Sequence, residues 1–281
     1  MCETNNRGRA VAALWIWVLL VCVACGGSAE ESAEEQHDGS LGHVVHWGYN
    51  SSDGPDRWAE LNSEWSICAD GRSQSPIDIR DAATSELDDM VLRFEPATLK
   101  IIHQEHVADV LHNGHTVQIN YTQGDTLTVA GMNYDLLQGH FHSPSEHTVD
   151  GKHFPMEMHL VHKAAGGDLA VIGVFIEEGE HNPVFDTVWN NLPTRKGVEV
   201  HLEHVTVNID ELLPRSRRTY RYDGSLTTPP CWEQVRWFVF EEPISLSAAQ
   251  IDEFKALFSG NNRPTQPLHG RRIVTDVTRG G

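Results

Sequence analysis

The sequence predicts a mainly β domain with a few peripheral helices. Short segments rich in β-branched and aromatic residues are bounded by Gly, Asn, Asp or Pro, as strands separated by turns would be. Two further segments have helical spacing and a helical start signal. No repeat or linker-like break interrupts the chain from residue 41 to residue 281, so this stretch is expected to form one domain.

The predicted elements follow one another along this stretch. The helix over 247–260 is expected to begin after Ser247, a good N-cap, and to stop at Gly260. The other predicted helix covers 183–192. Strands are predicted over 99–104, 108–113, 116–121, 126–131, 154–163, 169–177, 200–209 and 235–240.

The first 24 residues have the pattern of an export signal. Two arginines precede an apolar run, Val11 to Ala24, that is shorter than the roughly 20 residues of a membrane span. The run ends in CVACG, which resembles a bacterial lipobox with Cys25 as the lipidated residue, although cysteine at position 22 departs from the preferred leucine. We expect a lipoprotein-type signal peptide and a membrane-anchored protein of the cell envelope or periplasm. Cleaved soluble export and a retained anchor are the alternatives.

The chain is acidic, and an acidic polar segment follows the predicted signal. Residues 25–40 are rich in Glu, Ser and Gly without apolar periodicity, so they are expected to be a flexible tether to the domain at 41–281. The formal net charge of −19 would repel a phosphate backbone and argues against nucleic-acid binding.

Only two cysteines, Cys68 and Cys231, lie downstream of Cys25. In an exported protein such a pair is expected to form one disulfide. Two unpaired thiols are the alternative. The loop that the bond would close is long, and the chain-entropy model gives about 5 kcal/mol of stabilisation for it.

Histidines alternate within one predicted strand and recur in the next. Side chains two apart in a strand share a face. An Asp150-Gly151 turn between the strands predicts a hairpin, which would bring the two faces together. His140, His142 and His159 would then converge. The residues that share these faces are Gln138, His140 and His142 in the first strand, and Glu157, His159 and Val161 in the second.

Three neutral imidazoles with one open position are the ligand set of a catalytic zinc. They leave the 2+ charge undiminished, so the pKa of bound water falls to about 7 and a zinc hydroxide nucleophile forms. Gln138 and Glu157 would accept the second ring N–H of a ligand. A histidine pair in a chain with 17 histidines can also be a solvated patch. A cupin is disfavoured, because Tyr134 and His153 stand where its motif requires glycine.

Seven separated motifs, in order between His46 and Arg272, resemble the α-class carbonic anhydrases. The resemblance implies a single domain around a large central, mostly antiparallel, twisted sheet, with zinc at the bottom of a cone. It also implies reversible hydration of carbon dioxide to bicarbonate and a proton. The motifs are HWGY, QSPIDI, NGH, QGHFHSPSEHTV, MEMHLVH, DGSLTTPPCWEQVRW and NRPTQPL.

The resemblance implies zinc ligands at His140, His142 and His159. It implies that Thr227 accepts a hydrogen bond from zinc-bound hydroxide and donates one to Glu146. Because a carboxylate only accepts, it turns the threonine hydroxyl toward itself and aims the hydroxide at the substrate. Thr228 would contact substrate and bicarbonate.

The resemblance further divides the cone into apolar and polar sides. On the polar side, His115 matches the proton shuttle, since histidine titrates near neutral pH. The residues that would order the connecting water are Tyr49, Asn113 and Gln118. The carbon dioxide pocket would consist of Val161, Val171, Leu226, Val235 and Trp237. Without the resemblance these residues would be ordinary core, except Val161, which alternation already places on the face of the ligands.

Other matches surround the ligands. Gln138, Glu157 and Asn261 would orient the ligand imidazoles, the last through its backbone carbonyl. His147 matches a structural histidine. Cys68 and Cys231 match a disulfide of exported bacterial members, placed to brace the loop that carries Thr227.

The function expected is therefore that of a zinc hydro-lyase acting on carbon dioxide and bicarbonate. The alternatives are a non-catalytic relative that serves as a binding module, which would typically have lost a zinc histidine, and a histidine-rich metal buffer with several weak sites. The oligomeric state is left open, with a dimer as one option.

Overall fold

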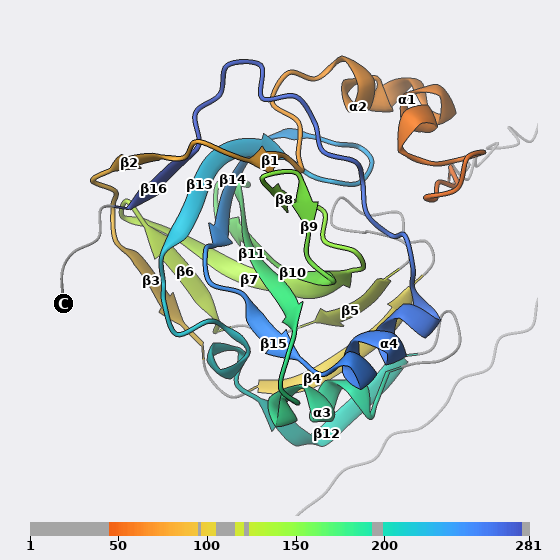
Figure 1. The fold of residues 1–281 in the computed structure, drawn as a ribbon, viewed down its shortest axis with the longest axis vertical. Coiled ribbons are helices and arrows are strands. Elements are labelled where there is room, and N and C mark those ends of the chain that lie inside the picture. Colours follow the sequence, from red (N-terminus) through yellow and green to blue (C-terminus); the bar gives the residue numbers. More distant parts are fainter. Residues whose placement is uncertain (1–44, 95–96, 105–115, 121–123, 193–198, 277–281) are drawn as a thin grey trace, which may run out of the picture. The chain divides into compact units, whose positions relative to one another are not determined.

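A computed structural model describes residues 45–94, 97–104, 116–120, 124–192 and 199–276 (Figure 1). These residues belong to one compact unit, Val44–Gly281. The predicted signal peptide and tether, with Cys25, lie outside the described residues. So do Asn113, His115 and the strand predicted over 108–113.

A large curled sheet dominates the described residues (Figure 1). It consists of β2 (Ala83–Ser85), β3 (Met90–Arg93), β4 (Ala97–Gln104), β5 (Thr116–Asn120), β6 (Thr126–Val129), β7 (Met132–His142), β10 (Met156–Ala164), β11 (Leu169–Glu178), β12 (Glu199–Val207), β13 (Thr219–Ser225), β14 (Glu233–Phe240), β15 (Ile244–Leu246) and β16 (Val274–Asp276). The order is β12-β4-β5-β7-β10-β11-β14-β13-β16-β2; β15 pairs with β11, and β6 pairs with β3 and β7.

Most neighbouring strands of this sheet are antiparallel, as the sequence predicted. The parallel pairs of this sheet, within the described residues, are β11–β14, β11–β15 and β16–β2. The strands of this sheet that were not predicted are β2, β3, β13, β15 and β16. The alternating charges Arg221 and Asp223 interrupt the apolar pattern of β13, which is too weak a local signal for a strand.

A small three-stranded sheet and several short helices complete the fold. The hairpin turn at Asp150-Gly151 is confirmed, and both residues have the positive φ (50° and 74°) that a tight hairpin turn requires. The strands are β1 (Asp78–Ile79), β8 (Thr148–Val149) and β9 (Lys152–His153). The helices are α1 (Trp58–Leu61), α2 (Ile67–Asp70), α3 (Pro183–Trp189) and α4 (Ala248–Leu257), with 3-10 turns at Pro55–Arg57, Ser63–Trp65 and Ile209–Leu212.

Helix α4 begins as predicted but ends earlier. Ser247 and Gln250 form a capping box at its start. The predicted stop at Gly260 is wrong, because the helix ends at Leu257 and Phe258 is already extended. The departure lets the Gly260 amide donate to the Ser143 carbonyl at 2.8 Å, a bond that a continuing helix could not make.

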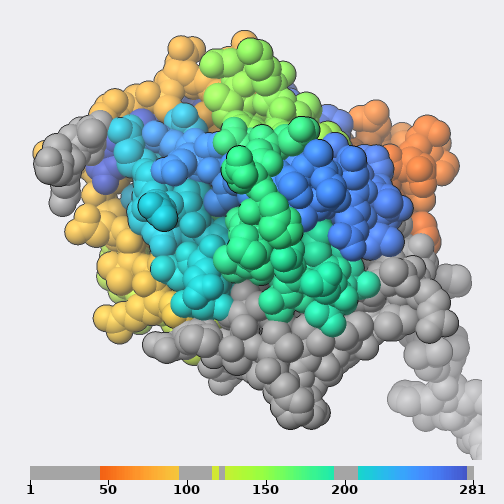
Figure 2. All heavy atoms as spheres, turned by 60° about the horizontal axis from the view of Figure 1, so that its bottom comes forward, coloured from red at the N-terminus to blue at the C-terminus, as the bar shows by residue number. Residues whose placement is uncertain are grey.

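Hydrophobic clusters cover both faces of the sheet beside the histidine strands. Phe141 points away from its histidine neighbours and packs edge-on against Trp189 and Phe254, with ring centroids 5.2 and 5.9 Å apart. These two aromatics come from α3 and α4, which lie side by side on the surface in Figure 2. The helices therefore fix the back of the strand that carries His140 and His142.

Within the described residues, no helix is long and apolar enough to cross a membrane.

Candidate metal centre

Two adjacent antiparallel strands, β7 and β10, place three histidines together. His159 stands directly opposite His140, and Glu157 stands opposite His142. Because side chains alternate in both strands, the three imidazoles emerge on one face. The predicted hairpin arrangement of these faces is thus present in the structure.

The three imidazoles form a compact buried group. The ring centroids are 5.0 Å apart for His140 and His142, 5.1 Å for His140 and His159, and 4.7 Å for His142 and His159. One nitrogen from each ring lies within 4.8 Å of the other two. No ring is more than slightly exposed. The group could hold a single metal ion.

Each of the three rings has its outer nitrogen bonded to an oxygen that only accepts. His140 Nδ1 donates to Gln138 Oε1 (2.7 Å), His142 Nδ1 donates to the Asn261 carbonyl (2.7 Å), and His159 Nε2 donates to Glu157 Oε1 (2.8 Å). These bonds fix the tautomers, so the inner nitrogens carry lone pairs. They match the orienting contacts expected for Gln138, Glu157 and Asn261.

Burial keeps two of these rings neutral. It lowers the pKa of His140 well below its usual value, and the neighbouring rings of His142 and His159 lower it further. Burial also lowers the pKa of His142. Nε2 of His142 is completely buried and has no hydrogen-bond partner among the described residues. An unpaired lone pair in a dry site is costly, and a metal ion bound there would satisfy it.

Glu157 binds several groups behind the metal centre. Its Oε1 accepts from His147 Nδ1 at 2.7 Å as well as from His159, and its Oε2 accepts the backbone amides of Glu146 and His147 at 2.9 Å. Burial opposes ionisation of this carboxyl, but the two imidazoles outweigh it, and the pKa lies well below its usual range. His147 Nε2 bonds to the Tyr222 hydroxyl at 2.6 Å, so both of its nitrogens are occupied. This arrangement matches the structural role expected for His147.

Glu146 lies beside the histidines with one oxygen bonded and one unpaired. Oε1 accepts the Arg263 amide at 2.8 Å, whereas Oε2 is buried, has no partner among the described residues, and lies 3.6 Å from His142 Nε2. Thr227 and Thr228 are buried in the loop that follows β13. The bond expected from Thr227 to Glu146 is not formed in the structure, and Oε2 is the atom that would accept it.

The apolar residues expected to receive carbon dioxide form one cluster next to the histidines. The sheet register aligns Val161 with Val171, and Val171 with Trp237. The Trp237 ring lies edge-on to His159, with centroids 4.9 Å apart. All five expected pocket residues belong to this buried cluster: Val161, Val171, Leu226, Val235 and Trp237.

The structure describes two of the four residues expected on the polar side. Gln118 in β5 stands directly opposite His140. Tyr49 lies edge-on to Trp47 and Trp58, with ring centroids 5.8 Å apart in both pairs. His115 and Asn113 lie outside the described residues, so their positions remain predictions.

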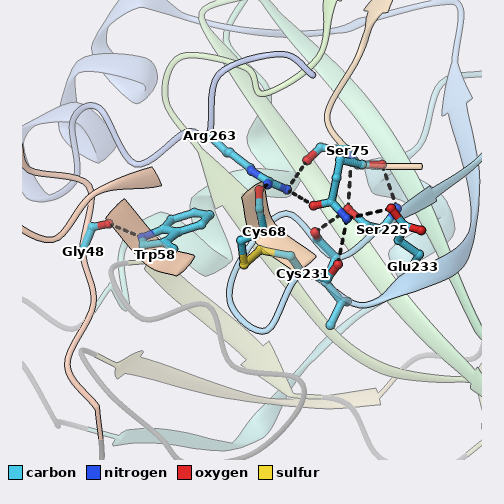
Figure 3. Close-up of a disulfide and its surroundings, with 10 residues drawn as sticks. Gly48, Trp58, Cys68, Ser75, Ser225, Cys231, Glu233 and Arg263 are labelled. Atoms are coloured by element: carbon cyan, nitrogen blue, oxygen red, sulfur yellow. Dashed lines mark hydrogen bonds between the residues drawn. A yellow bond between two sulfur atoms is a disulfide. The ribbon is translucent and has the colours of Figure 1, made fainter. Parts of the chain in front are cut away.

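The predicted disulfide between Cys68 and Cys231 is confirmed (Figure 3). Cys231 follows the two prolines of the Thr227 loop, and its amide donates to the Thr228 carbonyl at 2.8 Å. The bond therefore joins α2 to the end of this loop.

Sequence reasoning missed Arg263, which is almost wholly buried. Its guanidinium donates to the carbonyls of Cys68 (2.7 Å) and Ser75 (2.8 Å) and to Gln74 Oε1 (2.8 Å). Figure 3 shows it pointing at the disulfide-bonded segment. The only available signal was its place in the NRPTQPL motif, since an isolated arginine is usually exposed.

Comparison with known proteins gives consistent matches over nearly the whole described region. The family model described as eukaryotic-type carbonic anhydrase matches residues 53–277. The carbonic anhydrase of Nostoc sp. is 41% identical over 239 residues, covering 83% of this chain and 87% of the relative. That of Pectobacterium carotovorum is 43% identical over 231 residues, covering 82% and 91%. The solved α-carbonic anhydrase of Thermovibrio ammonificans, in complex with the inhibitor sulfanilamide, is 40% identical with a TM-score of 0.76, covering 82% and 99%.

Proposed function

Because the chain belongs to the eukaryotic-type carbonic anhydrase family, we propose that His140, His142 and His159 hold a zinc ion. The protein is a carbonic anhydrase, an enzyme that hydrates carbon dioxide reversibly. The observation that carries the proposal is the buried Nε2 of His142, which has no hydrogen-bond partner among the described residues, in a group of three rings that each bring one nitrogen within 4.8 Å of the other two. Zinc bound by three neutral nitrogens makes water a strong nucleophile near neutral pH.

Glu146 and Thr227 are proposed to orient the attacking group. The Arg263 amide binds Oε1 of Glu146 and leaves Oε2 as an acceptor facing the site. A hydroxyl that donates to this oxygen must itself accept from the attacking group, which directs the nucleophile. Thr227, in the loop braced by the disulfide, is the residue that would do so.

The apolar cluster is proposed to receive carbon dioxide. Its residues are buried and adjoin His159 through Trp237. A small nonpolar substrate loses little on leaving water for such a surface, whereas bicarbonate is poorly solvated there and is released. Thr228 would supply the polar contact at its edge.

Proton export is proposed to use His115. A histidine titrates in the range needed to pass a proton to buffer. Tyr49, Asn113 and Gln118 would order the connecting water. Gln118, opposite His140 in the register, supports a polar side next to the metal centre.

The proposed organisation of the whole chain follows from the sequence alone. Residues 1–24 would direct export, Cys25 would carry a lipid anchor, and residues 25–40 would tether the domain at 41–281 to the membrane of the cell envelope. Mass spectrometry of the mature N-terminus tests this. An unmodified residue at the N-terminus would contradict the anchor.

Stopped-flow hydration of carbon dioxide, measured on protein with and without chelator treatment, tests the metal centre. We expect one zinc ion per chain and activity that is lost on chelation and restored by zinc. His142→Ala should lose both. A variant that keeps stoichiometric zinc and full hydration activity would show that the ligand assignment is wrong.

A further inference from the structure

The segment Gly260–Arg263, which follows α4, runs beside the end of strand β7. The Gly260 amide donates to the Ser143 carbonyl, and the Arg263 amide donates to Glu146 Oε1, both at 2.8 Å. The segment thus touches the chain on either side of the turn after His142. Asn261, between these contacts, makes the bonds closest to the metal centre.

Asn261 binds three consecutive residues with three different groups. Its Oδ1 accepts from the Ser143 amide at 2.8 Å, and its Nδ2 donates to the Phe141 carbonyl at 3.0 Å. Its own backbone carbonyl accepts from His142 Nδ1 at 2.7 Å. The side chain therefore holds the backbone on both sides of His142, while the main chain holds the ring.

We propose that the Asn261 carboxamide is a positioning group for the metal ligand His142. The proposal rests on the metal centre proposed above. A ring is aimed correctly only when its backbone and its outer nitrogen are held in one frame, and Asn261 supplies both from one residue. The position needs a donor and an acceptor at this reach. Aspartate lacks the donor, and glutamine is one methylene longer.

Strand β5 leaves a gap in the backbone ladder that explains why side chains are needed here. The β5–β7 pairing ends at Gln118 and His140. Beyond it, the Thr116 hydroxyl donates to the Phe141 carbonyl at 2.5 Å and accepts from its amide at 3.3 Å. The Phe141 carbonyl thus receives two side-chain donors on this side, one from Thr116 and one from Asn261.

Arg263 anchors the same segment to the residues around the disulfide (Figure 3). Its three guanidinium bonds reach residues 68, 74 and 75, and its charge lies 5.6 Å from the ring centre of Trp58. Burial lowers the pKa of Arg263 to about 10, so the group stays charged at neutral pH. The frame around Asn261 is therefore held by the disulfide-bonded part of the domain.

The experiment measures zinc release from Asn261→Ala into excess chelator, after zinc content has been measured in both proteins. The substitution deletes the carboxamide but keeps the carbonyl that binds His142. We expect at least about 10-fold faster release, the lower end of the range for lost orienting contacts. With cobalt in place of zinc, the visible spectrum of the variant should differ from that of the wild type, because this spectrum reports the geometry of the ligands.

Gln250→Ala is the matched control. Gln250, in the first turn of α4, is also a buried amide. Its side chain donates to the Asn182 carbonyl (2.8 Å) and to Asp186 (3.1 Å). Its loss should lower the melting temperature without changing zinc release or the cobalt spectrum. The proposal would be overturned if Asn261→Ala lowered the melting temperature as Gln250→Ala does but released zinc at the wild-type rate.

If Asn261→Ala does not fold, Asn261→Asp carries the test, because it keeps the acceptor for the Ser143 amide and loses only the donor to the Phe141 carbonyl. It should release zinc several-fold faster, and an unchanged rate would overturn the proposal. Wild-type protein that binds no zinc would instead contradict the metal centre itself, and the positioning role with it.

Discussion

Oε1 of Glu157 accepts hydrogen bonds from two imidazoles at once, from His159 Nε2 at 2.8 Å and from His147 Nδ1 at 2.7 Å. Its second oxygen accepts two backbone amides. A carboxylate can accept on both oxygens, whereas an amide must present a donor at one of them. This buried anion therefore holds His159, a proposed metal ligand, and the turn after β7 in one frame.

Glu157→Gln should weaken zinc binding by about 10- to 100-fold, because the new NH2 group faces either two imidazole donors or two amide donors. The variant should also melt at a lower temperature. Competition with a chelator measures the affinity. Glu178→Gln, an exposed change at the end of β11, is the control. Equal affinity in all three proteins would contradict the role of the anion.

Gly173→Ala should disturb the same carboxylate from the neighbouring strand. Gly173 stands opposite His159, and an added Cβ would lie 3.1 Å from Glu157 Oε1 and 3.3 Å from Val239 Cγ2. Overpacking of this kind costs about 1–3 kcal/mol. We expect lower stability in urea together with faster zinc release.

Gly166→Ala is the matched control for this change. An added Cβ there meets only Asp168 Oδ2, at 3.5 Å, in the turn between β10 and β11. It should leave zinc release unchanged. If the control released zinc faster, or if Gly173→Ala released it at the wild-type rate, the close contact at Gly173 would not matter for the site.

Replacing Cys68 and Cys231 with serine should destabilise the fold strongly. The bond closes a loop with a sequence separation of 163, for which the chain-entropy model gives about 5 kcal/mol. Urea unfolding measures the loss. Dithiothreitol should destabilise the wild type in the same way and leave the double variant unaffected. A loss below about 1 kcal/mol would mean that the other bonds between these segments suffice.

His162 makes stability depend on pH in the acidic range. Burial lowers its pKa from 6.5 to about 4, so the unfolded chain binds the proton more readily than the folded one. The contribution of the neutral His162 to the free energy of unfolding is therefore fully present above about pH 6.5 and is lost as the pH falls toward 4. From pH 7.5 to pH 5 the loss from this group is about 2 kcal/mol.

His162→Gln removes the titrating group and keeps a donor for the Leu160 carbonyl, which His162 Nδ1 binds at 2.9 Å. Urea unfolding of the zinc-loaded proteins at the two pH values should show a smaller difference for the variant. The same pH dependence in both proteins would mean that other groups account for it.

The part of the site that depends on alternation could be predicted from the sequence. His140, His142 and His159 follow the two-residue period of strands, and the turn signal at Asp150-Gly151 lies in the segment that returns the chain from the first strand to the second. The disulfide followed from the small number of cysteines in a chain expected to be exported. In each case the information is local or is a simple count.

Contacts between distant segments could not be predicted in this way. The Tyr222 hydroxyl binds His147 because β13 lies two strands from β11 in a register that places Tyr222 opposite Trp237, and no local pattern encodes that register. The end of α4 depends on the Ser143 carbonyl, which lies more than a hundred residues away in sequence. Arg263 is buried only because carbonyls from the N-terminal segment converge on it.

The separation of Asn261 from the histidines along the chain has a consequence for the order in which the protein is made. A growing chain carries all three histidines from residue 159 onward, yet the groups that hold His142 and Glu146 arrive only with residues 261 and 263. A nascent chain that has not reached these residues therefore carries the proposed ligands without the frame around them. Tight retention of an ion by the proposed centre would then require a chain synthesised through residue 263.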